Sequence, residues 1–394
     1  MLLRGGKAEG MRRNYNRGYF KMKQNTKYMV TSGFLGAGKT TSMIAFAQSV
    51  NRRYGKAAIL ANDLGASNIV DADYTATTDV LTTSITGNCI CYQHENLVDK
   101  LHQLKAEGAM VIFSDIPGCG IGALDNVYLE LEKREPGEFD LMPFTCIVDP
   151  EHLRMIMPEK ANLHLPSEMC FLLDAQMAEA DLIVLNKTDL LDQNERDRRM
   201  AFIHTAYPDV PVMAMSARTG EGVDEVVDYL MTHKAPARHK EIGYGSEAFI
   251  AAENLLSWYN RRVFLEEKED KNVDFNKVIG DIFEGIREGL KQHEDNVPHL
   301  KAFASGTDGD FFKASLLGID YETEYARKLA HSYSALSVVI NARAAADSQV
   351  MADIVEKALD QVEEKYNLKA RTFFIETFGM TEEGKGNGGR ASRY

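Results

Sequence analysis

The sequence predicts an α/β fold, in which a mostly parallel sheet flanked by helices precedes a smaller α+β domain. From Lys27 to about Thr232, short apolar runs alternate with amphipathic helical patterns, an order typical of parallel sheets. The runs lack a clean alternation of apolar and polar residues, as strands buried on both faces should. Beyond residue 246 the apolar spacing changes, which indicates a second domain.

The first domain is expected over residues 27–232, with six short apolar runs as its strands. These runs are 28–30, 57–61, 109–113, 144–148, 182–185 and 212–215. A helical run, 42–50, follows the first strand directly. Residues 1–26 are basic and contain no apolar stretch of the secretory kind, so a disordered basic extension is expected there.

The second domain is expected over residues 247–380, after a linker at 233–246 that is rich in charge, proline and glycine. Apolar residues recur at helical spacing from Phe275 to Leu290 and from Met351 to Val362. Strands are expected around these two helices, at 256–265, 300–304, 311–316, 336–342 and 372–378. Residues 381–394 are rich in glycine and poor in apolar residues, so a disordered tail is expected.

Composition narrows the classes of function. The chain has 394 residues and a net charge of −13, so binding to nucleic acid, which needs a basic face, is not expected. No apolar run approaches the roughly 18 residues that span a bilayer, and no membrane association is expected. Five cysteines, an odd number without a secretory signal, argue against a disulfide framework and predict a cytoplasmic protein.

A phosphate-binding loop is the clearest motif. The stretch Gly33-Phe-Leu-Gly-Ala-Gly-Lys-Thr40 matches G-x-x-x-x-G-K-[ST] between a strand and a helical run, which predicts a P-loop NTPase domain. In such a loop backbone N–H groups surround the β-phosphate, Lys39 neutralises the β and γ oxygens, and the Thr40 hydroxyl ligates Mg²⁺. The residues expected to contact the nucleotide here are Gly33, Gly36, Ala37, Gly38, Lys39, Thr40 and Thr41.

Two later segments indicate that the base is guanine. Asn186-Lys-Thr-Asp189 follows a predicted strand, so the Asp189 carboxylate can accept hydrogen bonds from the guanine N1–H and N2 amine. Adenine lacks those donors, and an unpaired buried carboxylate is costly, so the expected nucleotide is GTP. Lys187 is expected to lie along the P-loop, and the backbone of Ser216 and Ala217 is expected near the guanine O6.

Three residues besides Lys39 are expected to act in GTP hydrolysis. Asp115 ends a strand within Asp115-Ile-Pro-Gly118, so its carboxylate is expected to hold Mg²⁺ through water, and the Gly118 N–H to sense the γ-phosphate. The alternative for Asp115 is an ordinary strand-ending residue in a turn. Asp63 ends the second strand and is expected to reach the metal or the attacking water. No glutamine or arginine is placed by sequence to orient that water, so slow intrinsic hydrolysis is predicted.

Several motifs resemble those of the metal-trafficking GTPases that include CobW, HypB and UreG, with the CobW branch closest. Besides the P-loop and Asn186-Lys-Thr-Asp189 they are Asn62-Asp-Leu-Gly65, Gly87-Asn-Cys-Ile-Cys91 and Asp115-Ile-Pro-Gly118. The resemblance covers the first domain and reaches the second only in outline. It implies a Cys-x-Cys-Cys segment that binds a transition metal beside the γ-phosphate. This sequence departs from that pattern, because Tyr92 replaces the third cysteine and Asp replaces the usual Glu at positions 63 and 115.

A third thiol is available nearby in the sequence. Cys119 follows Gly118 and is expected in the γ-phosphate region, so Cys89, Cys91 and Cys119 are expected to bind Zn²⁺ or Co²⁺, with His94 or water as the fourth ligand. The alternative is that these cysteines are small buried hydrophobic residues, which is the expectation for Cys146 and Cys170.

The motifs together predict a GTP-binding, slowly GTP-hydrolysing metallochaperone-like protein, whose nucleotide state sets its metal affinity. Its expected partner is a client metalloenzyme or corrinoid protein, and a homodimer is compatible with the sequence. One alternative is a G-protein chaperone that gates cofactor loading or reactivation of a corrinoid-type enzyme and carries no metal. Another is a nucleotide-dependent binding module that does not hydrolyse GTP, suggested by Asp115. A small-molecule phosphotransferase is disfavoured, because a guanine-reading motif is typical of switches.

Overall fold

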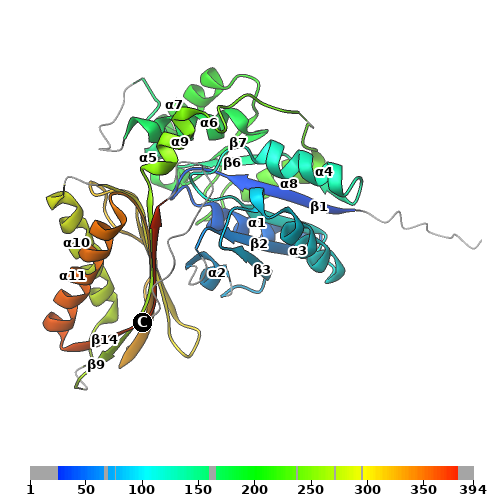
Figure 1. Ribbon diagram of the computed structural model, residues 1–394. Coiled ribbons are helices and arrows are strands. Elements are labelled where there is room, and N and C mark those ends of the chain that lie inside the picture. The colour runs from blue at the N-terminus through cyan, green and yellow to red at the C-terminus, as the bar shows by residue number, and fades with distance from the viewer. Residues whose placement is uncertain are drawn as a thin grey trace, which may run out of the picture.

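The structure is a computed structural model that describes residues 25–65, 70–75, 77–158, 166–236, 238–269, 272–293 and 296–379. These residues form two domains, each built on its own sheet (Figure 1). The basic extension expected at 1–26 lies outside the described residues except for Asn25 and Thr26, and the tail expected at 381–394 lies wholly outside them. Within the described ranges, no helix is long and apolar enough to cross a membrane.

The first domain contains an eight-stranded sheet in which every pair of strands is parallel, as the sequence predicts. Its strands are β1 (Thr26–Ser32), β2 (Ala57–Asp63), β3 (Leu81–Thr86), β4 (Val111–Asp115), β5 (Phe139–Leu141), β6 (Thr145–Val148), β7 (Leu182–Leu185) and β8 (Val212–Ala214). The strand order is β3-β2-β4-β1-β6-β7-β8, and β5 pairs with β1. Because parallel strands end at one edge of a sheet, the loops after β1, β2, β4 and β7 meet there.

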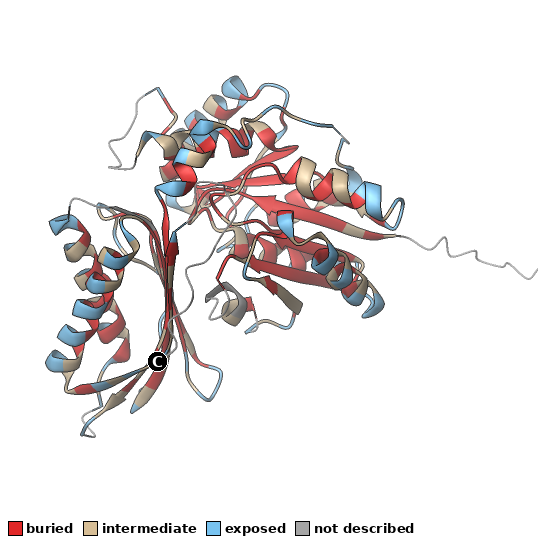
Figure 2. Cartoon of the chain, viewed as in Figure 1, coloured by how far each residue is buried: buried red, intermediate tan, exposed pale blue. Residues whose placement is uncertain are grey.

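Helices cover both faces of this sheet. They are α1 (Lys39–Arg53), α2 (Val70–Thr75), α3 (His94–Ala106), α4 (Glu130–Arg134), α5 (Pro150–Leu153), α6 (Ser167–Glu179), α7 (Gln193–Ala206) and α8 (Val223–Thr232). Three shorter or irregular turns of helix are η1 (Ile90–Tyr92), η2 (Leu124–Leu129) and η3 (Thr188–Leu190). One apolar core lies beneath α1 and α8, and another beneath α3, α6 and α7. Figure 2 shows the result, with buried strands between helices whose outer surfaces are exposed.

The second domain is the α+β unit that the sequence predicts. Its elements are β9 (Ser257–Glu267), α10 (Phe275–Gln292), β10 (Asn296–Ser305), β11 (Phe311–Leu316), β12 (Glu324–Arg327), β13 (Ala335–Ala345), α11 (Ser348–Tyr366) and β14 (Leu368–Gly379). The strands form an antiparallel sheet in the order β12-β11-β10-β13-β9-β14. Helices α10 and α11 share one apolar core with this sheet. They cover its outer face, and the opposite face turns toward the first domain (Figure 1).

The second domain was expected to begin at residue 247, where the structure has helix α9 (Glu247–Asn254). It packs against α6, and its Phe249 and Ala252 are buried in the core of the first domain. The second sheet begins only after it, at Ser257 of β9. Helix α9 therefore belongs by packing to the first domain, because its apolar face is buried there.

Candidate functional site

The P-loop connects β1 to α1 and curls back over the end of the sheet. Gly36 and Gly38 have positive φ angles of 79° and 94°, which side chains rarely adopt. A Cβ on Gly33 would lie 2.2 Å from the backbone oxygen of Ile147, so only glycine fits there. Lys39 Nζ donates a 2.7 Å hydrogen bond to the Gly33 carbonyl oxygen, which holds its positive charge inside the loop. The sequence motif thus becomes a cationic backbone cradle.

A pocket opens in front of this cradle and is lined by residues of both domains. From the first domain it is lined by P-loop residues together with Asn62, Asp63, Asp115, Gly118, Cys119, Asn186, Lys187, Asp189 and Ala217. Most of the residues predicted for nucleotide binding and catalysis therefore share one cavity, although they come from five separate loops and strand ends. Ser216 lies behind this wall and is fully buried.

The candidate Mg²⁺ ligands lie on the same pocket wall. Thr40 is the second residue of α1, and Asp115 is the last residue of β4. Both are more than nine-tenths buried. A hydroxyl and a carboxylate are hard oxygen donors of the kind that Mg²⁺ takes in nucleotide sites. The residues present therefore fit this ion.

The loop after β4 lies directly against the P-loop. A Cβ on Gly118 would come within 2.9 Å of the Leu35 backbone nitrogen, so glycine allows the two loops to touch. Gln176 of α6 fixes this loop, because its Nε2 atom donates to the carbonyl oxygens of Gly118 and Gly120 at 3.0 and 3.1 Å. No motif in the sequence points to Gln176, since it stands alone on a distant helix.

The two segments predicted to contact guanine also meet. Asn186 Nδ2 donates to the Ala37 carbonyl oxygen at 3.0 Å, and Asn186 Oδ1 accepts from the Ala217 N–H at 3.0 Å. One side chain thereby joins the P-loop to the loop after β8. The Asp189 carboxylate accepts a 2.6 Å hydrogen bond from Ser216 Oγ and pairs with Arg218, so its acceptor atoms are held in place beside the pocket.

Lys187 lies elsewhere than the sequence suggests. Its Nζ pairs with Asp149 at 2.9 Å and with Glu324 of β12 at 3.5 Å. Arg218 also reaches Glu324, at 3.9 Å. The lysine therefore ties the loop after β7 to the second domain in this structure, because the carboxylates of Asp149 and Glu324 attract its charge. Its predicted position along the P-loop stays a prediction for the nucleotide-bound protein.

The opposite wall of the pocket comes from the second sheet and was not indicated by any motif. Its residues are Trp258 of β9, His299 and Lys301 of β10, Lys313 and Ser315 of β11, Glu324 and Ala326 of β12, and Asn341 and Arg343 of β13. His299 and Lys301 are two residues apart on β10, and Asn341 and Arg343 are two residues apart on β13. Because side chains two apart on a strand point to the same face, each pair faces one side of the sheet. The sequence signal for this wall is the spacing of two between polar residues in each strand, and the sequence does not show which strands pair with one another.

This second wall adds three cations to the pocket, Lys301, Lys313 and Arg343, against one carboxylate, Glu324. Burial, followed by the charges of Lys301 and Lys39, holds the pKa of His299 well below its usual value. Arg343 Nη2 lies 3.2 Å from Asp63 Oδ1, which links the two domains across the pocket. The Arg343 guanidinium also lies 5.4 Å from the Trp258 ring. A polyanion such as a nucleotide phosphate chain suits this potential.

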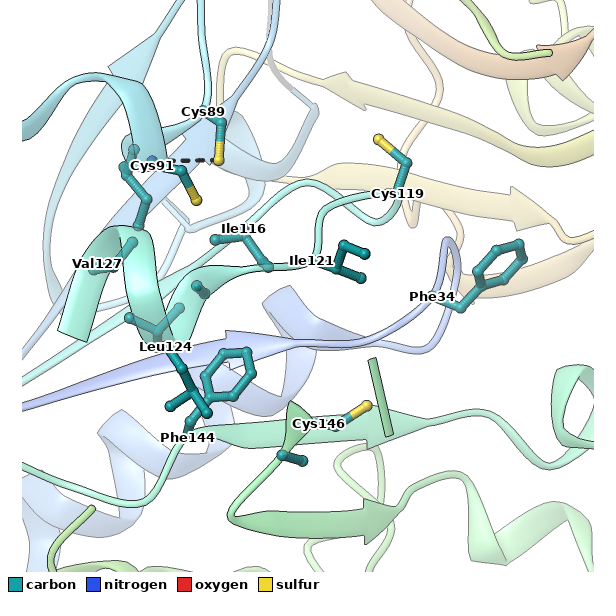
Figure 3. Packing of buried hydrophobic residues seen from close by; sticks show 14 of the residues in the cluster. Phe34, Cys89, Cys91, Ile116, Cys119, Ile121, Leu124, Val127, Phe144 and Cys146 are labelled. Atoms are coloured by element: carbon teal, nitrogen blue, oxygen red, sulfur yellow. Dashed lines mark hydrogen bonds between the residues drawn. The ribbon is translucent and has the colours of Figure 1, made fainter. Parts of the chain in front are cut away.

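The predicted thiol segment lies beside the pocket, inside the apolar core. Cys89, Cys91 and Cys119 are all less than a tenth exposed and belong to one apolar cluster with Leu35 and Ile116. Figure 3 shows Cys89 and Cys91 next to each other, with Cys119 on the loop after Ile116. Cys119 lines the nucleotide pocket, whereas Cys89 and Cys91 stand behind that lining.

Two of these three thiols, those of Cys91 and Cys119, are held in their protonated form in this arrangement. The hydrogen bond with Cys89 and burial raise the pKa of Cys91 well above its usual value, and the Cys91 N–H lies 3.4 Å from Cys89 Sγ. Burial, followed by the charge of Glu253, raises the pKa of Cys119. In the ranges that the structure describes, no three His, Cys, Asp or Glu side chains are grouped so as to hold a metal ion.

Asn62 connects the candidate Mg²⁺ ligand to the thiol segment. Its backbone N–H donates to Asp115 Oδ1 at 3.0 Å. Its side-chain oxygen accepts from the Ile90 N–H at 3.0 Å, and its side-chain nitrogen donates to the carbonyl oxygens of Asn88 and Ile85 at 2.9 and 3.2 Å. Ile90, which stands between Cys89 and Cys91, is thus hydrogen-bonded to strand β2, which also carries Asp63.

Among the described residues, neither the remaining cysteines nor His94 forms a group of three possible metal ligands with this segment. Cys146 is fully buried in β6, and burial raises its pKa to about 12, as expected for a core residue. Cys170 is partly buried, and its Sγ lies 3.6 Å from the Met155 carbonyl oxygen. His94 begins α3, and burial lowers its pKa.

Comparison with known proteins relates the first domain to one family of nucleotide-binding domains. Residues 27–213 match the sequence model of the CobW/HypB/UreG nucleotide-binding domain. A stretch of 77 residues is 38% identical to hydrogenase maturation factor HypB of Cupriavidus necator, and it covers 19% of this chain and 21% of that protein. The chain thus spans about a fifth of the length of this curated relative.

Solved structures resemble the chain more distantly. HypB from Helicobacter pylori in complex with nickel is 16% identical, with 53% of this chain and 87% of that chain covered and a TM-score of 0.38. The Zn(II)-bound YjiA GTPase from E. coli is 15% identical, with 84% of this chain and 99% of that chain covered and a TM-score of 0.34.

Proposed function

We propose, from the premise that residues 27–213 belong to the CobW/HypB/UreG family of nucleotide-binding domains, that this chain is a GTP-dependent metal carrier. It binds GTP with Mg²⁺, hydrolyses it slowly, and uses the presence of GTP to set the affinity of Cys89, Cys91 and Cys119 for a transition metal. The metal is cargo for a client metalloenzyme or corrinoid protein, and thiolates favour Zn²⁺ or Co²⁺ over Mg²⁺.

The observation that carries this proposal is the position of Asn62. Its backbone bonds to the Asp115 carboxylate, and its side chain makes three hydrogen bonds to the segment from Ile85 to Ile90. A change at Asp115 when nucleotide binds is therefore transmitted to the thiols through one residue. Because the contacts are direct, the coupling needs no long pathway.

GTP recognition divides between the two ends of the pocket. Asp189 supplies the acceptors for the guanine N1–H and N2 amine, and Ser216 orients that carboxylate. Lys39 and the backbone of the P-loop receive the phosphates. Mg²⁺, when bound through Thr40 and Asp115, supplies charge neutralisation at the phosphate oxygens. The Gly118 N–H, beside the P-loop, is the proposed donor to the γ-phosphate, and Asp63 the proposed partner of the attacking water.

Burial of the thiols provides a state of low metal affinity that nucleotide binding can change. Metal ions bind thiolates, and the raised pKa values of Cys91 and Cys119 mean that the sulfurs carry protons in the present arrangement. Metal binding thus requires that the segment loosens from its apolar surroundings. GTP promotes this change by recruiting Asp115 and thereby shifting Asn62, and hydrolysis reverses it.

Linkage provides the test. If GTP raises the affinity for metal, metal must raise the affinity for GTP by the same factor, typically about 5- to 150-fold. We expect the Kd of a non-hydrolysable GTP analogue to fall by such a factor when Zn²⁺ or Co²⁺ is present. Cys89→Ser with Cys91→Ser should abolish the effect, and Asn62→Ala should reduce it.

The control for Asn62→Ala is Asn51→Ala, because the Asn51 side chain also bonds a backbone N–H, that of Ala57, but lies away from the thiols. Equal affinities for the analogue with and without metal in the unmodified protein would refute coupling. Thermal unfolding curves of each variant separate a loss of coupling from a loss of fold.

The burial of the cysteines also favours a second candidate, a G-protein chaperone that gates cofactor loading on a client without carrying metal. Such a protein would use the thiols only as core residues. Intact GTP binding without Co²⁺ binding in any nucleotide state would support this candidate over the metal carrier.

A further inference from the structure

The loop after β2 touches the second sheet at the nucleotide pocket. Arg343 of β13 places its Nη2 atom 3.2 Å from Asp63 Oδ1, and the two side chains are only 7% and 11% exposed. A Cβ on Gly65 would lie 2.5 Å from Asn260 Nδ2 of β9, so glycine allows the loop to approach the sheet closely. The motif Asn62-Asp-Leu-Gly65 therefore meets the second domain, at a point where Asp63 and Arg343 both line the pocket.

The Arg343 side chain is held in place by several neighbours. Its Nη1 atom donates to the Ala342 carbonyl oxygen at 3.0 Å and to Asn260 Oδ1 at 3.4 Å. Asn260 is itself fixed, because its Nδ2 atom donates to Glu376 Oε2 at 2.9 Å. The guanidinium also lies 5.4 Å from the Trp258 ring. A guanidinium held in this way loses little freedom when it binds an anion, so it is preorganised for one.

The strand order determines which part of a nucleotide Arg343 would meet. Strands β2 and β4 lie on one side of β1 and its P-loop, whereas β7 and β8, which precede the segments predicted to contact guanine, lie on the other side. Asp63 ends β2, and the neighbouring Asn62 N–H donates to Asp115 Oδ1 at 3.0 Å. Arg343 therefore stands at the phosphate end of the pocket, near the candidate Mg²⁺ ligand Asp115, and away from the base end.

We propose that Arg343 is a catalytic residue for GTP hydrolysis, an arginine finger supplied by the second domain of the same chain. This inference rests on the proposed GTPase function. In the reaction the oxygen of a water molecule bonds to the γ-phosphorus, and the bond from that phosphorus to the β–γ bridging oxygen breaks. The electron pair of the broken bond stays on GDP, and both water protons leave on inorganic phosphate. The Arg343 guanidinium neutralises the negative charge that develops on the bridging and γ-phosphate oxygens.

The contact with Asp63 defines where the guanidinium lies in this structure. A carboxylate carries one negative charge, whereas the phosphate chain of GTP carries several, so the guanidinium should move from Asp63 to the γ-phosphate when GTP binds. The same movement releases the Asp63 carboxylate, which is the proposed partner of the attacking water. Because GDP has no γ-phosphate, the contact between the domains responds to the nucleotide state.

The test is GTP hydrolysis by the full chain with Mg²⁺, measured in single turnover with protein in excess. We expect Arg343→Ala to lower the rate constant at saturation by at least about 100-fold. Arg343→Lys should recover little of the rate, because lysine lacks the planar, two-pronged donor geometry. The matched control is Arg262→Ala, because Arg262 also forms an ion pair between the domains, with Asp73 at 2.9 Å, but neither residue lines the pocket.

A second measurement separates catalysis from folding. GDP with aluminium fluoride mimics the phosphoryl group in transit, so a residue that acts in the transition state strengthens binding of that complex. The unmodified protein should bind GDP more tightly with aluminium fluoride than without it. Arg343→Ala should lose this gain while it still binds a non-hydrolysable GTP analogue, and Arg262→Ala should keep the gain.

The outcomes separate the finger from the proposed function. Unchanged hydrolysis and an unchanged gain with aluminium fluoride in Arg343→Ala would overturn the assignment of Arg343 and leave the proposed GTPase standing. No hydrolysis by the unmodified protein, with or without Zn²⁺ or Co²⁺, would overturn the GTPase and the finger together. If Arg343→Ala does not fold, Arg343→Lys decides: a rate loss of about 10-fold or more supports the finger, and an unchanged rate overturns it.

Discussion

The two walls of the nucleotide pocket are built in opposite ways. The first wall consists of short contiguous motifs at the ends of parallel strands, in which backbone atoms and fixed side chains converge. The second wall consists of alternate side chains from neighbouring antiparallel strands, including Lys301, Lys313 and Arg343. The chain as a whole carries a net charge of −13, yet this face of the second sheet gathers cations.

The difference indicates separate tasks for the two walls. Hydrogen-bond donors and acceptors fixed in a loop select a particular ligand, whereas distributed charge attracts any anion of the right size. The first wall should therefore determine which nucleotide binds, and the second should add affinity for its phosphates. Because the walls belong to different domains, a nucleotide between them would also hold the domains together.

Removal of the P-loop cation tests the first wall most severely. We expect Lys39→Ala to weaken GTP binding by roughly 100-fold or more, about 3 kcal/mol, because the partly buried positive charge expected to neutralise the phosphates is lost. Calorimetric titration with a non-hydrolysable analogue measures the effect. Lys56→Ala, which removes an exposed lysine bonded to the Glu107 carbonyl oxygen, should change nothing. A loss below threefold in Lys39→Ala would mean that the second wall carries most of the phosphate affinity.

Replacement of the base reader tests selectivity within the same wall. In Asp189→Asn the acceptor pair becomes one acceptor and one donor, so GTP should bind about 30- to 100-fold more weakly. Xanthosine triphosphate, whose C2 carbonyl can accept from the new amide, should bind better than GTP to this variant. Competition between the two nucleotides measures the preference, and Asp209→Asn on an exposed loop is the control. An unchanged preference for GTP would remove Asp189 from the base site.

Substitution in the second wall should have the smallest effect. Arg343→Ala is expected to raise the Kd of the GTP analogue by about 10-fold, with Arg343→Lys intermediate because it keeps charge and loses the planar guanidinium. The effect should shrink with added salt, since it is largely electrostatic. If Arg343→Ala lowers the melting temperature but leaves nucleotide affinity intact, the contact with Asp63 is purely a link between domains.

The contrast between the two walls explains why the first wall could be predicted from the sequence and the second could not. The P-loop, Asp115 and Asn186-Lys-Thr-Asp189 are contiguous, and each follows an apolar strand, so their meeting at one sheet edge follows from the parallel fold. Lys301, Lys313 and Arg343 share no motif, because their proximity depends on the pairing of β10 with both β11 and β13. That pairing joins residues far apart in the chain, and strand registers are not written in local sequence.

The strands that the sequence did not predict lack a recognisable local pattern. Strand β3 reads Leu-Thr-Thr-Ser-Ile-Thr and lies at the edge of the sheet, so it lacks the apolar run of the buried strands. Strand β5 has three residues and β12 has four, which is too short for a period to show.

Trp258 has a practical consequence for all of these measurements. It is the one tryptophan among 394 residues, and it lines the nucleotide pocket, stacked on Phe378 at a ring separation of 5.6 Å and close to Arg343. Its indole is therefore a built-in optical reporter at the seam between the two walls. Fluorescence excited selectively at this ring should register nucleotide arrival and any parting of the domains, without a dye attached to the cysteines under study.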